Sequence, residues 1–534
     1  MLPTHHVFRM THALRRARPA PARRPLPPPA TPARCYAAPH MQNGTLLAAV
    51  DLGSNSYRLE IGRHDHGQIR RVEYIKETVR QGNGLDEQRN LTEEAMERGL
   101  ACLARFAERL AGFDQRQVRA VATQTLREAR NRDVFLARAR QVLGFPIDVI
   151  SGREEARLIY QGVAHLLPQS DERRLVVDIG GRSTELILGQ QFTARVMESY
   201  RVGSVAWSTR YFPDGQFTEA AFERAEIAAQ AVLDEALAAY GRDQWDVAYG
   251  SSGTIGAVSD VLVAAGWAEG LVTREGLDWL YQALLAARSI DRVRMEGLKD
   301  DRRPVIGGGL SVLRALFSLL QIDEMRPAEG ALRHGVLYDM LDREHPDTDV
   351  RATTVNGLAL KFGADPAQGA RVGKVAVQLL RQLRAQDSPA DLTGQERKLQ
   401  WAAQLHEIGN LISHSDSHKH GAYILHNADA PGFDQAELDH LSLLVLGHRG
   451  KLRKLEADFE DEAFVHQLLC LRLAVILCHA RRDPQLAGLR LRASGREATL
   501  TVPREWARSW PQSAHLLREE VLAWQKTPWQ LALA

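Results

Sequence analysis

The chain contains few cysteines and no long hydrophobic run. Only four of its 534 residues are cysteines, and no two of them have the spacing of a CxxC pair or of a zinc site. This excludes a disulfide-stapled miniprotein and suits a reducing compartment. No run approaches the roughly 20 apolar residues that a membrane-spanning helix needs. We therefore expect a soluble protein of the cytoplasm, without stable membrane insertion.

A strong net charge is also absent. The formal charge is +2, but residues 1–40 hold seven arginines and no acidic residue, so residues 41–534 carry a net charge of −5. A mildly acidic body argues against a general nucleic-acid coat, because such a coat needs an excess of positive charge. We expect no nucleic-acid partner, and any polyanion must be bound by a local patch.

Residues 1–40 form an extension rich in arginine and proline. They hold nine of the 22 prolines, so we expect this segment to be disordered. A mis-assigned translation start is our first interpretation, because Met41 lies a few residues before the first convincing strand. A targeting segment and a basic tail that touches polyanions are the alternatives.

The rest of the chain predicts an α/β protein followed by a helical region. Short apolar strands alternate with helical segments to about residue 350, which is typical of α/β folds. Helical periodicity then dominates to about residue 482, and one clear alternating strand follows at 498–502. The expected domains are the extension at 1–40, an N-terminal lobe at 41–160, a second lobe at 161–345, a helical domain at 346–482 and a small C-terminal domain at 483–534.

One internal repeat organises the α/β part. Residues 50–56 and 177–184 both read as a hydrophobic strand, an aspartate, a turn of small residues and a second strand. Their aspartates, Asp51 and Asp178, lie 127 positions apart. Two such units at that separation suggest two similar lobes that face each other across a cleft.

The residue types of these hairpins point to phosphate and a divalent cation. Glycines let backbone N–H groups approach a phosphate, and Ser and Thr hydroxyls add donors. The aspartate at the end of each strand would repel phosphate unless a cation lies between them. Asp51 and Asp178 therefore predict Mg²⁺ held through carboxylates and water. The alternative is two ordinary β-turns in which each aspartate caps local N–H groups.

Two more glycine-rich turns and one arginine are further candidates. The turns at 250–254 and 307–309 either bind additional phosphate or make tight strand-to-helix connections. Arg127 follows the predicted strand at 118–122 and offers a planar fork for phosphate oxygens. A solvated arginine at a helix start is its alternative. The candidate ligands in the turn at 250–254 are Ser252, Gly253 and Thr254.

Acidic residues open the helix that follows residue 150. Ser151 is expected to be its N-cap, and acidic residues in the first turn complement the helix dipole. Capping explains one glutamate but not both Glu154 and Glu155, and hydrolysis of a phosphoanhydride needs a general base that orients water. Glu185 is another candidate for this base, because strand alternation from Asp178 leaves its side chain near the same cation.

These motifs are joined by others at 123–131, 151–159, 331–337, 401–409 and 418–425. Together with the turns at 51–56, 178–185 and 250–254, they resemble the exopolyphosphatase/guanosine pentaphosphate phosphatase family. The likeness is collinear from about residue 46 to 508. Because the helical C-terminal half is present, the chain looks more like the long bacterial exopolyphosphatases than the short two-domain members.

The resemblance implies a fold, a reaction and a set of site residues. The fold is two RNase H-like lobes of the actin/sugar-kinase superfamily, followed by an all-α HD-like domain and a small C-terminal α+β domain. The resemblance also implies a homodimer. The reaction is Mg²⁺-dependent release of terminal orthophosphate from inorganic polyphosphate, or of the γ-phosphate from guanosine pentaphosphate (pppGpp). Glu155 corresponds to the catalytic base, and Asp178 and Glu185 to the acids that organise metal and water. The implied phosphate-binding residues are Gly53, Ser54, Asn55, Arg127, Gly180, Gly181, Ser183 and Thr184.

Four functions are open, and we place an exopolyphosphatase with Glu155 as general base first. A pppGpp 5′-phosphatase is the main alternative. An ATP-dependent small-molecule kinase shares the two hairpins but leaves Glu155 without a role. A non-catalytic sensor of polyphosphate or alarmone is the most distant alternative, and the presence of both Glu155 and Glu185 counts against it.

Two positions depart from the family pattern. The family usually has a third glycine where this chain has Arg182, which would be strained there at positive φ and would otherwise add a cation to the phosphate loop. His406-Glu407 stands where an HD enzyme has His-Asp, so we expect a metal-free helical domain with a binding role. The basic residues expected to guide a polyphosphate chain, with a solvated charged loop as the alternative, are His418, Lys419, His420, Arg449 and Lys451.

Overall fold

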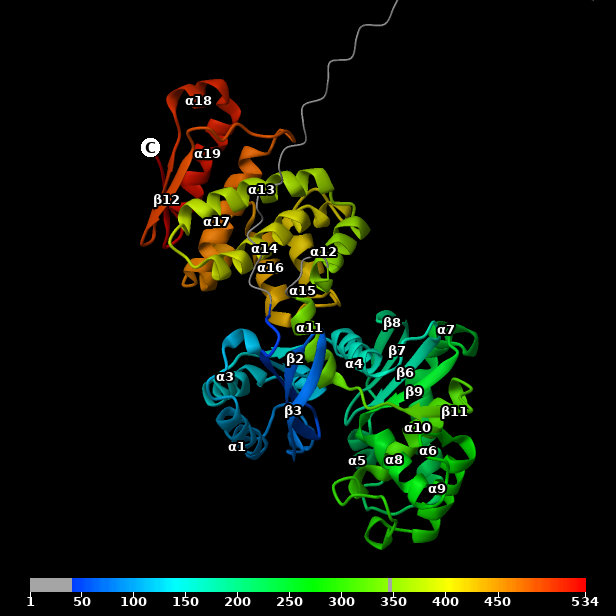
Figure 1. Cartoon of the computed structure of the whole chain (residues 1–534). Helices are drawn as coiled ribbons and strands as arrows, with labels where there is room; N and C mark the ends of the chain where they lie inside the picture. Colours follow the sequence, from blue (N-terminus) through cyan, green and yellow to red (C-terminus); the bar gives the residue numbers. More distant parts are fainter. Residues whose placement is uncertain (1–40, 344–347) are drawn as a thin grey trace, which may run out of the picture. The chain divides into compact units, whose positions relative to one another are not determined.

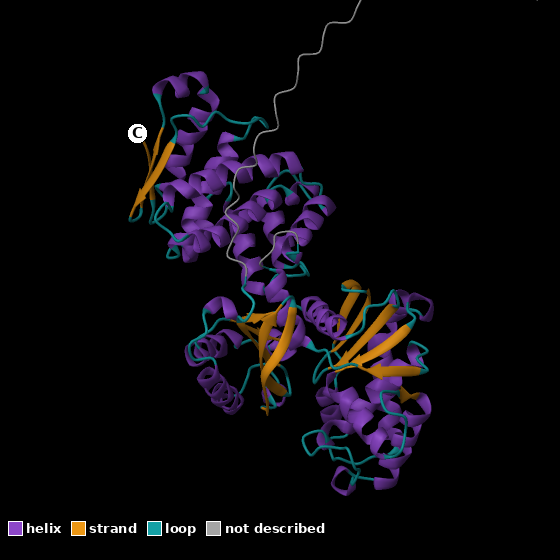
Figure 2. Cartoon of the chain, viewed as in Figure 1, coloured by secondary structure: helices purple, strands orange, loops and turns teal. Residues whose placement is uncertain are grey.

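The computed structural model describes residues 41–343 and 348–534, which contain three β-sheets and many helices (Figures 1 and 2). In Figure 1 the first sheet is blue, the second runs from cyan to green, and the third is orange to red. The predicted α/β class is confirmed, because strands and helices alternate through both larger sheets. Residues 1–40 and the interpretations given for them lie outside the described residues. Among the described helices, none is both long and apolar enough to cross a membrane.

The first sheet has the strand order β3-β2-β1-β4-β5 and is built from these elements: β1 (Leu46–Leu52), β2 (Ser56–Asp65), β3 (Gln68–Thr78), α1 (Glu93–Arg109), β4 (Val118–Ala122), α2 (Gln124–Glu128), α3 (Arg132–Leu143), β5 (Ile147–Val149) and α4 (Gly152–Leu166). β1 to β3 form an antiparallel meander, whereas β4 and β5 run parallel to β1. Six of the seven β1 residues are buried, which suits a strand in the middle of a covered sheet.

The second sheet has the order β10-β11-β9-β6-β7-β8, and its elements are β6 (Arg173–Ile179), β7 (Thr184–Gln190), β8 (Thr193–Tyr200), α5 (Ser204–Tyr211), α6 (Glu219–Leu233), α7 (Leu237–Tyr240), β9 (Val247–Ser251), α8 (Ser252–Ala264), β10 (Val272–Thr273), α9 (Arg274–Ala287), α10 (Ile306–Leu319), β11 (Glu324–Pro327) and α11 (Leu332–Asp342). β6 to β8 are again an antiparallel meander, and β9 and β11 are again parallel to its first strand. Without β10, the order and sense repeat those of the first sheet. The predicted repeat is therefore the β1–β2 and β6–β7 hairpins at equivalent positions.

The two sheets share a hydrophobic cluster through α4 and α11. Leu47 on β1, Val176 on β6 and Val336 on α11 are all fully buried in it. The two helices approach closely because glycines lie at their crossing: a Cβ on Gly335 would overlap the carbonyl oxygen of Leu158. This packing fixes α4 between the sheets.

Replacing Gly335 by alanine is expected to lower the free energy of unfolding by about 3 kcal/mol, because overpacking a closed contact costs ~1–3 kcal/mol and the new atom meets backbone here. The matched control is Gly357→Ala in α12 (Val350–Lys361), where an added Cβ meets nothing within 4 Å. There alanine should stabilise the helix by up to ~1 kcal/mol. Thermal unfolding followed by circular dichroism measures both variants, and equal melting temperatures would contradict the packing argument.

Residues 348–534 are helical except for a small third sheet. The elements are α12, α13 (Pro366–Leu383), α14 (Pro389–Leu405), α15 (Ser417–His426), α16 (Gln435–Gly447), α17 (Glu462–Leu477), β12 (Arg490–Ser494), β13 (Glu497–Thr501), α18 (Arg504–Ser509), α19 (Pro511–Trp524) and β14 (Gln530–Leu533). One hydrophobic cluster runs through these helices and the third sheet. The strand predicted at 498–502 is β13, and β12 and β14 flank it. The predicted domain boundaries stay predictions.

Candidate active site

The turns of the two predicted hairpins line one cavity of about 410 Å³. They also contact each other: a Cβ on Gly181 would lie 3.3 Å from the Cβ of Ser54 and 3.6 Å from the backbone nitrogen of Asn55. Successive turn residues with accessible N–H groups form an anion-binding concavity. The predicted phosphate ligands that line the cavity are Gly53, Ser54, Asn55, Gly180, Gly181 and Ser183.

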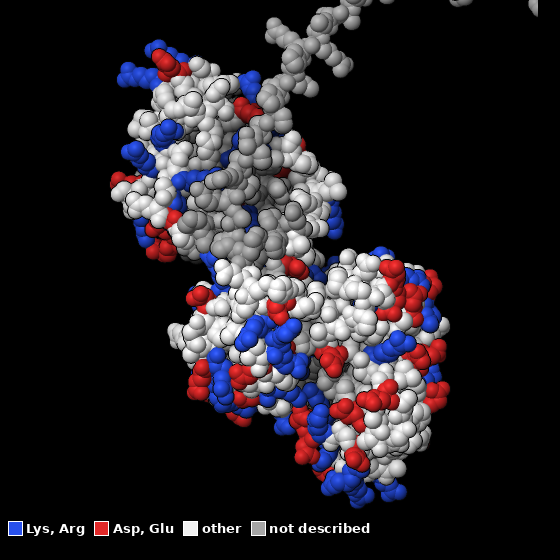
Figure 3. Space-filling view, viewed as in Figure 1, with Lys and Arg blue, Asp and Glu red and all other residues white. Residues whose placement is uncertain are grey.

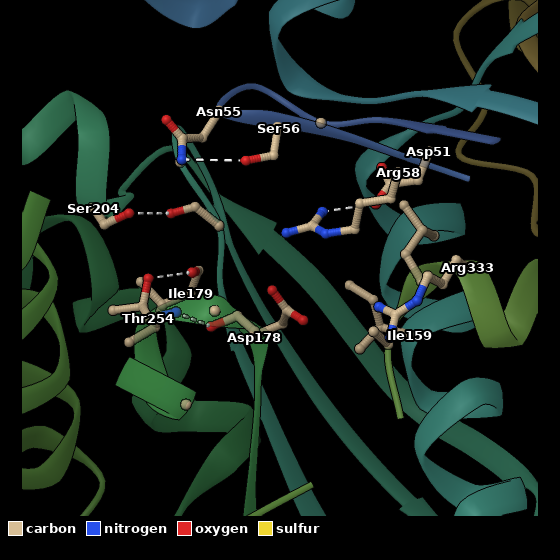
Figure 4. A pocket seen from close by; sticks show the side chains of 18 of the residues that line it. Asp51, Asn55, Ser56, Arg58, Ile159, Asp178, Ile179, Ser204, Thr254 and Arg333 are labelled. Carbon is tan, nitrogen blue, oxygen red and sulfur yellow. Dashed lines mark hydrogen bonds and ion pairs between the residues drawn. The ribbon is translucent and has the colours of Figure 1, made fainter. Parts of the chain in front are cut away.

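The third predicted turn lies in the same cavity. Ser252, the first residue of α8, has a φ of +96°, a strained conformation that proteins keep mainly at functional sites. The hydroxyl of Thr254 donates to the carbonyl oxygen of Ile179 at 3.0 Å, which ties this turn to the end of β6 (Figure 4). Ser252, Gly253 and Thr254 all line the cavity, as expected of phosphate ligands.

The fourth glycine-rich turn is a packing contact. Residues 307–309 lie within the first turn of α10, and a Cβ on Gly308 would overlap the backbone of Ser208 in α5. These glycines let two buried helices approach each other, and they do not line the cavity. The structure therefore supports neither of the two interpretations given for this turn.

Four carboxylates gather at one side of the cavity. Asp178 on β6 and Glu185 on β7 are direct cross-strand partners, so their side chains lie on the same face of the sheet. Asp51, Asp178 and Glu155 line the cavity, whereas Glu185 is 1% exposed and lies behind the lining. Burial raises the pKa of Asp178. The pKa of Glu185 is held well above its usual range, first by burial and then by the negative charges of Glu155 and Asp178.

Glu155 has the placement of a general base. It lies in the first turn of α4, lines the cavity and is 7% exposed. Its Oε2 accepts a hydrogen bond of 2.8 Å from Nη1 of Arg127. The preceding Glu154 instead is fully buried, pairs with Arg157 at 2.7 Å and accepts a hydrogen bond from the backbone N–H of Gly432. The two glutamates thus have different partners: Glu154 is tied into buried packing, whereas Glu155 faces the cavity. Capping of the helix alone would not distinguish them.

The acid limb of the pH–rate profile should reflect Glu155. Burial raises its pKa to about 6, an effect that Arg127 opposes and that Asp51 and Asp178 reinforce. The carboxylate form, which accepts a proton, dominates above that pH, so kcat/KM should rise through pH 6 and level off above about pH 7. Replacing Arg127 by glutamine should move this limb to higher pH. The ionisation of the substrate cannot move between variants, so an unmoved limb would contradict the assignment.

Arg127 and Thr184 do not lie where phosphate ligands are expected. Arg127 approaches Glu155 from outside the cavity lining and donates to the side-chain oxygen of Gln124 at 2.7 Å and to the carbonyl of Ile150 at 2.9 Å. Thr184 is fully buried and donates its hydroxyl to the carbonyl of Val202 at 2.6 Å. Arg127 therefore holds the carboxylate of Glu155, and Thr184 holds the start of β7.

Cations that the sequence analysis did not single out also line the cavity (Figure 4). Arg58 pairs with Asp51 at 2.9 Å, and Arg333 pairs with Glu60 at 2.5 Å. Arg302 is 9% exposed, and its guanidinium lies against Gly253 of the third turn. The pKa of Arg302 is lowered by burial first and by the neighbouring Arg58 second. Cations crowded in this way predict an anionic ligand.

Local signals existed for two of these cations only. Arg58 on β2 is the direct cross-strand partner of Asp51 on β1, so the register of the predicted hairpin places both side chains on one face. Arg333 lies within the segment 331–337 that the resemblance already included. Lys76, which pairs with Asp301 at 2.6 Å, and Arg302 come together only through the fold.

Arg182 is not strained and does not line the cavity. Its φ is not positive, so the strain alternative is excluded. Its guanidinium pairs with Glu128 at 2.8 Å and donates to the carbonyl of Gly82 at 3.2 Å. Arg182 thus belongs to the turn between β6 and β7, but its guanidinium binds residues of the segment that forms the first sheet.

The residues predicted to guide polyphosphate differ in exposure. Lys419, Arg449 and Lys451 are exposed, whereas His418 is 8% exposed. Burial and the cations Lys454 and Arg449 lower the pKa of His418 to about 4, so it is neutral and poorly suited to attract an anion. His420 is half-buried, and none of these five lines the 410 Å³ cavity. Their binding role stays a prediction.

The surface charge is mixed on one face of the molecule (Figure 3). Basic and acidic side chains of the described residues are interspersed on the face drawn in Figure 3. An extended area of one sign would be needed for a general polyanion coat. The face drawn in Figure 3 therefore gives no indication of such a coat.

The donor set fits magnesium held largely by a substrate. In the part of the chain that the structure describes, no group of three or more His, Cys, Asp or Glu side chains could hold a metal ion. Of the predicted ligands, Asp51 is engaged by Arg58 and Glu185 lies behind the lining, so Asp178 is the carboxylate open to the cavity. Mg²⁺ usually keeps waters and combines one or two carboxylates with substrate phosphates.

Comparison with known proteins gives matches along most of the chain. The model described as "Ppx/GppA phosphatase family" matches residues 60–344, and that described as "Ppx/GppA phosphatase, domain III" matches residues 350–522. A protein of Vibrio atlanticus named guanosine-5′-triphosphate,3′-diphosphate pyrophosphatase is 40% identical over 478 residues, 89% of this chain and 95% of its own length. A protein of the same name from Pseudoalteromonas translucida is 38% identical over 91% of this chain and 98% of its own.

A solved structure shares the fold of about half the chain. The crystal structure of an exopolyphosphatase from Cytophaga hutchinsonii aligns with a TM-score of 0.50 and 23% identity. The alignment covers 56% of this chain and 98% of the other. At this identity the likeness concerns the fold alone.

Proposed function

The chain belongs to the Ppx/GppA phosphatase family, and on this premise we propose that it hydrolyses the terminal phosphate from the 5′-triphosphate of pppGpp. The observation that carries the proposal is one cavity that brings together three phosphate-type turns, a cluster of cations and the carboxylate of Glu155. The products would be guanosine 5′-diphosphate 3′-diphosphate and orthophosphate.

The prediction that placed exopolyphosphatase first is wrong. The two curated relatives described above carry the name guanosine-5′-triphosphate,3′-diphosphate pyrophosphatase and match this chain over at least 95% of their own length. This finding favours the alternative, pppGpp, over inorganic polyphosphate.

The chain's own residues supply a hydrolytic step. Glu155 orients a water molecule toward the γ-phosphorus and accepts its proton as the water oxygen bonds to that phosphorus. The bond from the γ-phosphorus to the bridging oxygen breaks, and the electron pair stays with the β-phosphate. Backbone N–H groups of the turns and the guanidinium of Arg302 offset the charge that develops on the phosphate oxygens.

Magnesium is part of this proposal. Asp178 would hold the ion together with oxygens of the substrate. When bound, Mg²⁺ would neutralise charge on the β- and γ-phosphates.

The finer description of the fold is also a proposal. The equal strand order and sense of the two larger sheets support two RNase H-like lobes of the actin/sugar-kinase superfamily. An HD-like helical domain, a separate C-terminal domain and a homodimer follow from the family resemblance.

Orthophosphate release tests the proposal. We expect release from pppGpp with Mg²⁺ at a kcat/KM at least tenfold above that for ATP or long-chain polyphosphate. A preference for polyphosphate would contradict the substrate, and ATP consumption that depends on a small acceptor would favour a kinase. Binding of pppGpp without turnover would favour a sensor.

A further inference from the structure

A chain of hydrogen bonds leads from Arg182 to the catalytic carboxylate. Nη2 of Arg182 donates to Oε2 of Glu128 at 2.8 Å, and Nε2 of Gln124 donates to Oε1 of the same carboxylate at 2.6 Å. Oε1 of Gln124 accepts from Nη2 of Arg127 at 2.7 Å, and Nη1 of Arg127 donates to Glu155 at 2.8 Å. Five side chains from three separate parts of the sequence are thus joined without a gap.

The orientation of the Gln124 amide connects the two ends of this chain of hydrogen bonds. An amide offers two donors on nitrogen and acceptors only on oxygen. Because the nitrogen donates to Glu128, the oxygen is left to face Arg127, where it accepts from both Nε at 3.1 Å and Nη2. Turned around, the amide would set its N–H groups against a guanidinium that has only donors. Glu128 therefore fixes the amide orientation in which Gln124 holds Arg127, in addition to the hydrogen bond of Arg127 with the carbonyl of Ile150.

Arg182 is the one member that comes from the second sheet. It lies in the β6–β7 turn, whereas the other four belong to the segment from α2 to α4. Its side chain is 24% exposed and that of Glu128 is 13% exposed, so the ion pair is shielded in part from water. A second hydrogen bond, to the carbonyl of Gly82, fixes the guanidinium. The link therefore depends on the two halves of the site being in contact.

We propose that Arg182 is a positioning residue for Glu155. Its ion pair with Glu128 fixes the amide of Gln124, and that amide holds Arg127 against the catalytic carboxylate. The inference rests on the proposed function, in which Glu155 is the base. It gives a role to the position at which this chain departs from the glycine of the family pattern.

Loss of Arg182 should affect turnover more than binding. Without its cation, Glu128 is free to turn toward water, and Gln124 loses the acceptor that fixes its amide. Arg182 does not line the cavity, so the contacts with substrate remain. We expect R182G to lower kcat about tenfold, which corresponds to ~1.4 kcal/mol, and to change KM less than twofold.

A double-mutant cycle tests the route through Glu128. E128A should lower kcat about as much as R182G, and the double variant should be no slower than either single variant. R182K, which keeps the charge opposite Glu128, should recover at least half of the lost kcat. The matched control is R201A, because Arg201 is exposed and acts on Glu128 by its charge without a hydrogen bond to any described residue. Its kcat should stay within twofold of wild type.

Each other outcome is decisive. Effects of R182G and E128A that multiply would overturn the route, and a rise in KM at constant kcat would make Arg182 a substrate ligand instead. A kcat of R182G equal to that of wild type would overturn the inference while leaving the proposed function intact. A wild type that prefers ATP or polyphosphate would overturn the proposed function alone, and the cycle is then measured with that substrate. A wild type inactive on all three would overturn both.

Discussion

Replacing Glu155 by glutamine should lower kcat for pppGpp hydrolysis by about 10³-fold and leave KM within about threefold. The amide has the shape of the carboxylate but cannot accept a proton, and general base catalysis contributes ~10²–10⁴-fold. Glu155 lines the cavity, and as the proposed base it should affect the transition state rather than substrate binding. Steady-state assays of orthophosphate release measure both constants.

The neighbouring glutamate is the matched control for this variant. Glu154 is fully buried and holds Arg157 and the backbone of Gly432, so Glu154→Gln should lower the melting temperature. Its kcat in the folded state should stay within threefold of wild type, because the side chain does not line the cavity. If the two variants lost activity equally, Glu155 would have no special role.

Replacing Arg302 by alanine should lower kcat/KM by about 10²-fold, the loss that removal of one preorganised donor to a developing charge typically causes. Arg302 is 9% exposed, and its guanidinium lies against Gly253. With the residues that the structure describes it forms only one ion pair, a long one of 3.8 Å with Asp301. A buried cation with so little compensation is available to phosphate oxygens. Most of the effect should appear in KM if Arg302 holds a phosphate that does not react, and in kcat if it faces the γ-phosphate.

The adjacent arginine separates charge from position. Arg303 pairs with Asp300 at 2.5 Å and does not line the cavity. Arg303→Ala removes the same charge one position away, so its kcat/KM should stay within threefold of wild type. An equal loss in both variants would mean that only the overall charge of this segment matters.

The hairpins and their acids could be predicted because the relevant signals are local. Alternation along β6 and β7 correctly put Asp178 and Glu185 on one face, and the strand register makes them direct partners. The N-cap at Ser151 was likewise predictable and is present, with its hydroxyl accepting from the N–H of Glu154 at 3.1 Å. A residue pattern within ten positions was enough in each case.

Residues whose placement depends on distant segments were predicted poorly. Lys76 and Arg302 line the same cavity although more than 200 positions separate them, and nothing around either one indicates this. Arg127 was expected in the cleft because it follows a strand, but the hydrogen bonds of its guanidinium with Gln124 and Glu155 place it outside the cavity lining, behind Glu155. Tertiary contacts decide such cases.

The sequence analysis named no strand at the positions of β3 and β8, and one physical reason applies to both. β3 and β8 are at or near the sheet edges, and most of their residues are exposed or half-buried. β3 in particular carries several charged residues, which protect an edge strand from pairing with another chain but hide its apolar alternation. The glycines at 307–309 led to the opposite error, because they were predicted to form a turn and instead lie in a helix. In a sequence, glycine that permits close helix packing looks like glycine in a turn.

Hydrolysis of pppGpp in ¹⁸O-labelled water tests the central claim most directly. If water activated by Glu155 attacks the γ-phosphorus, mass spectrometry will find one ¹⁸O in the released orthophosphate and none in guanosine 5′-diphosphate 3′-diphosphate, and the Glu155→Gln variant will form neither product at a comparable rate. Release of pyrophosphate, label in the nucleotide, or an unchanged rate in the variant would contradict the account.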